Sequence, residues 1–149
     1  MDHVAIMKKE WRLIPKILSG VKTVESRWYK NKVCPWNKVF AGDTLYFKNS
    51  GEKVSVRAHI TKAEQLEVIG NKHALEIMSL RAKADLGTTT IPESVIGYIF
   101  NKRYAVFIHF DEVQKVEPFD IDKRRFGAQC AWITCKNIST ITKTTQRST

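Results

Sequence analysis

The residues of this chain best suited to chemistry lie in the run 20–27, which reads Gly-Val-Lys-Thr-Val-Glu-Ser-Arg. Its alternating pattern predicts a strand over 23–29, and successive side chains of a strand point to opposite faces. The polar face of that strand carries Thr23, Glu25 and Arg27. Lys22, at the start of the strand, has a side chain long enough to reach the same space. This face is either an exposed ladder with a weak surface ion pair, or the wall of a cleft in which a guanidinium holds a carboxylate.

Aromatic and lysine side chains alternate directly after this strand, in the loop 28–38. Lys30, Lys32 and Lys38 are placed to contact phosphates, which provide most of the sequence-independent affinity for nucleic acids. Trp36 either stacks on a base or pins the loop against the core. The loop is therefore a candidate cationic wall beside the charged strand.

The composition of the chain favours an anionic partner. Its 149 residues include 25 Lys and Arg against 15 Asp and Glu, a formal net charge of +10 at pH 7. A charge of this sign attracts polyanions such as nucleic acids, although lysine-rich surfaces also serve solubility alone.

The pattern Gly-x-Lys-x-x-Glu-x-Arg resembles the ASCH family, a branch of the PUA-like β-barrels that is mostly associated with RNA. The resemblance implies a cleft beside a barrel, lined by Lys22, Glu25 and Arg27. There the carboxylate would accept hydrogen bonds from an exocyclic amine or a ribose hydroxyl, and the lysine would meet a phosphate. The expected partner is RNA or single-stranded nucleic acid, including a modified nucleotide. With the strand and loop residues described above, the expected binding residues are Lys22, Thr23, Glu25, Arg27, Lys30, Lys32, Trp36 and Lys38.

The same resemblance leaves an enzymatic function open. Some small bacterial ASCH proteins look like amidohydrolases that deacylate a modified cytidine, with Gly-x-Lys-Thr-x-Thr-x-Arg at this place. Lys22, Thr23 and Arg27 match that pattern, whereas Glu25 replaces the second threonine. A lysine with a lowered pKa would act as a base, and a ribonuclease activity would likewise rest on Lys22 and Glu25. A protein-interaction module is a third alternative.

Metal and cofactor motifs are missing from the sequence. The four histidines are scattered, and Cys130 and Cys135 are too far apart for a two-residue zinc knuckle. Neither a phosphate loop nor a Gly-x-Gly-x-x-Gly motif is present. We therefore expect no cofactor and no metal.

Targeting signals are also missing. No apolar run is long enough to span a membrane, and the first ten residues do not read as a signal peptide. We expect a soluble intracellular protein of the cytoplasm or nucleus, without a membrane partner. In such a compartment the three cysteines should remain reduced.

The order of elements predicts one small α+β domain. Helical periodicity over 8–19 is interrupted by Pro15, which argues for a late start or a kink, and Gly20 is placed to end that helix. Further helices are expected over 71–84 and 92–100. Strands are expected over 23–29, 44–48, 53–62, 104–116 and 131–135. The fold class is a PUA-like mixed β-barrel of about five or six strands with flanking helices, spanning residues 1–142, with a flexible polar tail over 143–149.

Overall fold

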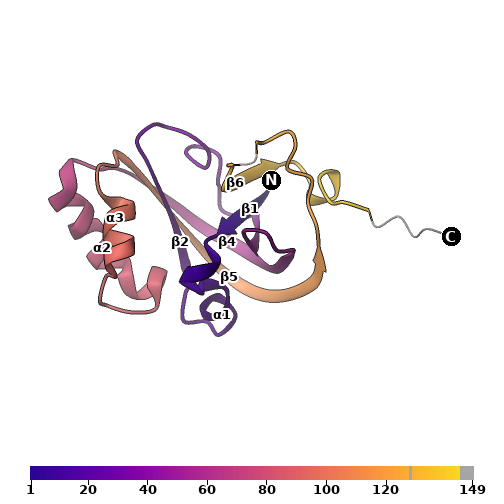
Figure 1. Cartoon of the computed structure of the whole chain (residues 1–149), viewed down its shortest axis with the longest axis horizontal. Helices are drawn as coiled ribbons and strands as arrows, with labels where there is room; N and C mark the ends of the chain where they lie inside the picture. Colours follow the sequence, from indigo (N-terminus) through magenta and orange to yellow (C-terminus); the bar gives the residue numbers. More distant parts are fainter. Residues whose placement is uncertain (128, 145–149) are drawn as a thin grey trace.

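The computed structural model describes residues 1–127 and 129–144. Its main element is a six-stranded sheet with the order β2-β5-β4-β3-β1-β6, which curls into a half-barrel (Figure 1). The strands are β1 (Asp2–Met7), β2 (Val24–Tyr29), β3 (Thr44–Asn49), β4 (Val54–Glu67), β5 (Tyr104–Phe119) and β6 (Trp132–Cys135). β1 pairs with β3 in parallel, whereas the other neighbours are antiparallel. The predicted mixed sheet is confirmed.

The helices flank this sheet, as predicted. They are η1 (Lys9–Trp11), α1 (Leu13–Leu18), α2 (Gly70–Leu86), α3 (Glu93–Ile99) and η2 (Ile138–Thr140). α2 and α3 form the connection between β4 and β5 and lie together at one end of the molecule (Figure 1). α2 ends at Gly87, whose φ of 72° is a left-handed conformation that glycine adopts at little cost. Among the described residues no side chain caps the other end of α2, and Asn71 accepts a hydrogen bond from the backbone of Asn101 (2.8 Å).

Strand β5 separates two hydrophobic clusters, because its alternate side chains point to opposite faces. Ile108 and neighbouring residues of one face pack with α1 inside the curl of the sheet. Phe107 on the other face packs with Trp28 and with the helices α2 and α3. Full burial of side chains of this size contributes about 1.5–3 kcal/mol each to folding. Val24 and Trp28 are therefore the side chains that β2 packs against the helices.

Two segments near the N-terminus differ from the prediction. β1 was not expected, because five of its six residues are buried and it shows none of the alternation that marks a half-exposed strand. The helix expected over 8–19 is divided at Arg12, whose φ is 50°. A start at Leu13 places Pro15 in the first turn, where its missing amide hydrogen costs nothing. The late start that Pro15 predicted is therefore confirmed.

The described C-terminal segment stays paired with the rest of the fold as far as Lys143. Thr142 forms a bridge with Ile121, and the backbone amide of Lys143 donates to Asp120 (2.8 Å). Most of the predicted tail, residues 145–149, lies outside the described residues. Every helix in the described part of the chain is too short or too polar to serve as a transmembrane span.

Candidate functional site

The turn after α1 determines where the charged residues of β2 lie. Gly20 adopts a φ of 82°, which ends the helix. The backbone amide of Lys22 then donates to Lys16 (3.0 Å), and that of Thr23 donates to Ala84 (2.8 Å). These bonds hold the start of β2 against the C-terminal end of α2, two segments about 60 residues apart in the chain.

Lys22 is a fully enclosed cation. Its ammonium donates to the carbonyl of Val24 (2.5 Å) and to both the carbonyl and Oδ1 of Asp85 (2.6 and 2.5 Å). Oε1 of Glu25 lies 3.1 Å away. The side chain has no exposed surface, so the direct phosphate contact expected from the sequence does not fit its position. Lys22 instead holds two carboxylates in place.

Glu25 and Arg27 form the ion pair that the sequence predicts, and the pair is buried. Arg27 Nη2 lies 2.9 Å from Glu25 Oε2, and the two residues are 6% and 5% exposed. The same guanidinium donates to the carbonyls of Ile6 (3.2 Å) and Ala131 (3.0 Å). β2 and β6 are the two edges of the sheet, so Arg27 bridges from one edge to the segment beside the other. Its guanidinium also lies over the ring of Trp132 (5.5 Å).

Asp85 completes the cluster. It is 3% exposed, and its Oδ2 accepts a hydrogen bond from the hydroxyl of Ser26 (2.5 Å). That hydroxyl in turn accepts from the indole of Trp28 (3.1 Å). The sequence offered a signal for Asp85: it lies in the last turn of a helix, where a carboxylate is unfavourable, and on the buried face with Met78 and Ala82. An acid in such a position requires a cation from elsewhere in the fold.

Burial and neighbouring charges shift the pKa values of this cluster in opposing directions. Burial raises the pKa of Glu25, but Lys22 and Arg27 outweigh it and hold the pKa below its ordinary value. Burial lowers the pKa of Lys22, but Asp85 and Glu25 outweigh it and the pKa is raised. For Asp85, burial prevails over the attraction of Lys22, so its pKa is raised. These directions favour the charged form of Lys22, which argues against the role of base considered above, and make Asp85 the member best able to hold a proton.

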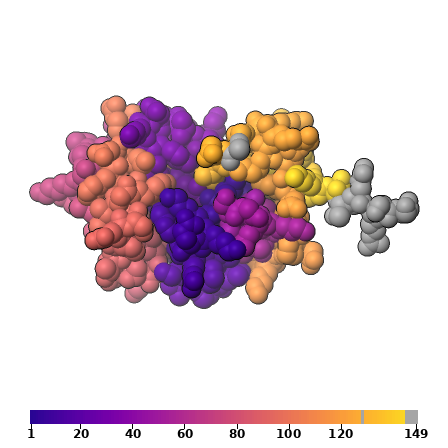
Figure 2. Space-filling view, viewed as in Figure 1, coloured from indigo at the N-terminus to yellow at the C-terminus, as the bar shows by residue number. Residues whose placement is uncertain are grey.

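A pocket of about 260 Å³ opens onto this cluster. Its walls carry, among others, Met7, Trp11, Glu25, Ser26, Arg27, Trp28, Asp85 and Tyr98. The rings of Trp11 and Tyr98 meet edge to face with centroids 5.8 Å apart, and both remain partly exposed. Lys8 lies 4.8 Å from the Trp11 ring, and Lys102 lies 5.5 Å from the Tyr98 ring. Figure 2 shows the N-terminal segment, in indigo, beside the α3 segment on this face of the molecule.

The other predicted residues lie outside this pocket. The side chain of Thr23 is exposed at the start of β2. Lys30, Lys32 and Lys38 are exposed in the loop after β2. Trp36 is half-buried against Tyr104, with ring centroids 5.2 Å apart and the ammonium of Lys32 5.9 Å from its ring.

A larger, more open hollow of about 540 Å³ begins at Tyr104 and is lined by residues 67–71 and 101–104. Lys102 and Arg103 belong to this hollow, and Lys102 also lines the pocket at Glu25. It contains none of the buried charged residues, so we place the chemistry in the smaller pocket. The larger hollow extends a basic surface from that pocket toward Tyr104.

Solved structures with the same fold exist. The chain superimposes on ASCH from Zymomonas mobilis with a TM-score of 0.63 and 15% identity, covering 95% of this chain and 96% of that one. A serine-to-alanine mutant of the same protein gives a TM-score of 0.65 at 16% identity, covering 93% and 91% of the two chains. A tyrosine-to-phenylalanine mutant of that protein gives a TM-score of 0.64 at 16% identity, covering 93% of each chain. No protein-family model and no curated protein matches the sequence.

Proposed function

Starting from the ASCH-domain fold that this chain adopts, we propose that it binds RNA or a nucleotide, with one base in the pocket at Glu25. One observation carries the proposal: a buried carboxylate, fixed between two cations, lies in the wall of a pocket that is otherwise lined mainly by aliphatic and aromatic side chains. A pocket with a few oriented polar groups among apolar and aromatic walls is the usual form of a small-molecule site.

Glu25 has the hydrogen-bonding capacity that the proposal needs. Lys22 occupies a site on Oε1 and Arg27 one on Oε2, whereas an ionised carboxylate offers about four acceptor sites. The remaining sites can accept from an exocyclic amine or a ribose hydroxyl. Because Glu25 has a lowered pKa, it remains an acceptor at neutral pH.

Aromatic and basic residues around the opening complete the proposed site. The partly exposed rings of Trp11 and Tyr98 can stack on a base, an interaction that contributes about 1–3 kcal/mol per base. Lys8 and Lys102 lie beside these rings, where the phosphate of a bound nucleotide would be held. The exposed lysines of the loop 30–38 then contact phosphates of neighbouring nucleotides in a longer strand.

Salt-dependent binding to a single-stranded RNA tests both parts of this proposal. Glu25→Gln keeps the shape of the side chain and should weaken binding of a preferred base while leaving the salt slope unchanged. Replacing Lys30, Lys32 and Lys38 together by Gln should reduce the slope of log K against log salt by about 2, since each phosphate contact contributes about 0.7 on single strands.

The matched control replaces three exposed lysines elsewhere, Lys53, Lys115 and Lys136, and removes the same charge. Equal slopes for the two triple variants would exclude the loop 30–38 as a phosphate-binding wall. Unchanged base preference in Glu25→Gln, with the fold verified by circular dichroism, would exclude the pocket as the base-binding site.

A hydrolase of the ASCH group, acting on an acylated cytidine or as a ribonuclease, is the second candidate. The observation that favours it is the contact between Asp85, with its raised pKa, and the Ser26 hydroxyl on the pocket wall. In this version Asp85 transfers a proton, Glu25 positions the substrate, and Lys22 holds both carboxylates in place. Chromatography after incubation with N4-acetylcytidine or an RNA oligonucleotide distinguishes the candidates, because a binding protein releases no product. Release by wild type that persists in Asp85→Asn would refute the assigned proton transfer.

A further inference from the structure

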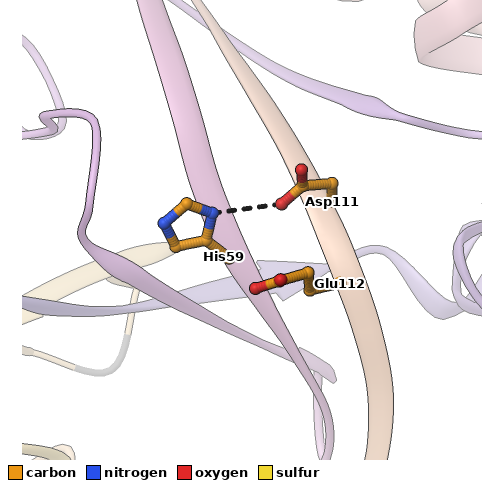
Figure 3. A group of neighbouring side chains, drawn as sticks. All are labelled: His59, Asp111 and Glu112. Carbon is orange, nitrogen blue, oxygen red and sulfur yellow. Dashed lines mark hydrogen bonds and ion pairs between the residues drawn. The ribbon is translucent and has the colours of Figure 1, made fainter.

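A second group of side chains, remote from the pocket in sequence, lies across β4 and β5. His59 on β4 is directly paired with Asp111 on β5, and Glu112 follows Asp111 (Figure 3). One nitrogen or oxygen atom from each residue lies within 4.8 Å of the other two. We propose that His59, Asp111 and Glu112 bind one divalent transition-metal ion of the Zn²⁺ type.

The backbone explains why two consecutive carboxylates face the same histidine. Neighbouring residues of a regular strand point to opposite faces. At this place the register of β4 against β5 shifts between Arg57 and His59, and Glu112 has a φ of 51°. Such irregularities redirect a side chain, so that both Asp111 and Glu112 reach toward His59 (Figure 3).

The spacing of the groups suits direct coordination. His59 Nδ1 lies 3.1 Å from Asp111 Oδ1. Bonds of about 2.1 Å to one ion place two ligand atoms about 3.0 Å apart at right angles and about 3.4 Å apart at tetrahedral angles, and the distance from His59 to Asp111 lies between these two values. The side chain of Glu112 has the freedom to supply the third bond. One imidazole and two carboxylates form a mixed nitrogen and oxygen ligand set that suits Zn²⁺, Mn²⁺, Fe²⁺ and Co²⁺.

The surroundings leave room for a hydrated ion. A hollow of about 130 Å³ is lined by His59 and Glu112 together with Thr44, Arg57, Ala58 and Gln114. The side chains of His59 and Asp111 are 44% and 59% exposed, so an ion can enter without rearrangement of the fold. The two carboxylates balance the charge of a divalent ion, which limits its repulsion by Arg57. With three protein ligands, further positions on the ion stay open to water or an exogenous anion.

This proposal is independent of nucleotide binding, because the metal site shares no residue with the pocket at Glu25. It also revises the expectation of no metal. The spacing could not show the site, since His59 and Asp111 are 52 residues apart and only the pairing of β4 with β5 brings them together.

Titration of the untagged full chain with Zn²⁺ in a calorimeter tests the proposal. We expect one equivalent to bind, with a loss of affinity of at least about tenfold in His59→Gln and a clear loss in Glu112→Gln. His109→Gln is the matched control: His109 Nε2 lies 2.7 Å from Glu64, but Arg81 already occupies that carboxylate. The affinity of His109→Gln for Zn²⁺ should equal that of wild type.

Co²⁺ provides a second measurement, because its absorption spectrum distinguishes oxygen and nitrogen ligands from thiolates. A spectrum without thiolate charge-transfer bands, altered in His59→Gln, supports the site. Thiolate bands, no binding heat, or equal affinities of wild type and His59→Gln would each overturn it.

Discussion

Replacing Lys22 with Met should reveal how strongly the buried cluster depends on one cation. The variant removes an ammonium with four acceptors and leaves the side chains of Glu25 and Asp85 more than nine-tenths buried without it. Removal of one partner from a buried ion pair costs about 3–5 kcal/mol, because the remaining charge stays buried. In a domain of this size each kcal/mol lowers Tm by about 2–4 °C, so the expected decrease is about 6–20 °C.

The loss of stability in Lys22→Met should also depend on pH. Without Lys22, Glu25 keeps Arg27 as its partner, whereas Asp85 loses its cation, so burial raises the folded-state pKa of Asp85 further above its unfolded value. Protonation of Asp85 then favours the folded state, so its stabilisation is present at low pH and disappears as the pH rises through the folded pKa. The difference in unfolding free energy between wild type and Lys22→Met should therefore be smaller at pH 5 than at pH 8.

Urea denaturation of both proteins at the two pH values measures this difference. Lys53→Met, which removes an exposed lysine, is the control and should change the unfolding free energy by less than about 0.5 kcal/mol. A loss below about 1 kcal/mol in Lys22→Met, or an equal loss at both pH values, would refute the reasoning that burial makes this cation indispensable.

Three further predictions concern pH and stacking. The lowered pKa of Glu25 stabilises the fold above its unfolded pKa of about 4.3, so wild type should lose more stability than Glu25→Gln below that pH in urea titrations; parallel curves would contradict this. Burial lowers the pKa of His3, so wild-type stability should fall as the pH drops below about 6.5, and His3→Gln should flatten the fall; an equally steep fall would count against it. Tyr98→Ala should weaken RNA binding by about 5- to 150-fold in fluorescence anisotropy, and Trp36→Ala by less, because Trp36 packs against Tyr104. The reverse order would indicate that the base binds at the loop 30–38 and not in the pocket.

Most regular elements could be predicted because their local patterns agree with the fold. The alternating side chains up to Tyr29 form the strand β2, and the glycine after α2 ends that helix. β1 could not be recognised, since a short strand buried on both faces lacks a period. The division of the first helix at Arg12 depends on a left-handed residue that nothing in the local sequence requires.

The candidate site was predictable only where its residues are neighbours in sequence. Glu25 and Arg27 share a face because strands repeat every two residues, so their pairing follows from spacing alone. Burial of that pair does not follow, because it depends on Asp85 and Tyr98, which reach the site only when α2 and α3 pack on the sheet. Conversely, Lys22 looks accessible in the sequence but is enclosed by the end of α2.

The central position of β5 has a consequence for how the molecule loses its structure. Its backbone is hydrogen-bonded on one side to β2 and on the other to β4, while its side chains belong to both hydrophobic clusters. Neither cluster can unfold without exposing one face of β5 to solvent. Heating should therefore release both in one cooperative step, and the amides of residues 105–110 should exchange with deuterium only through complete unfolding.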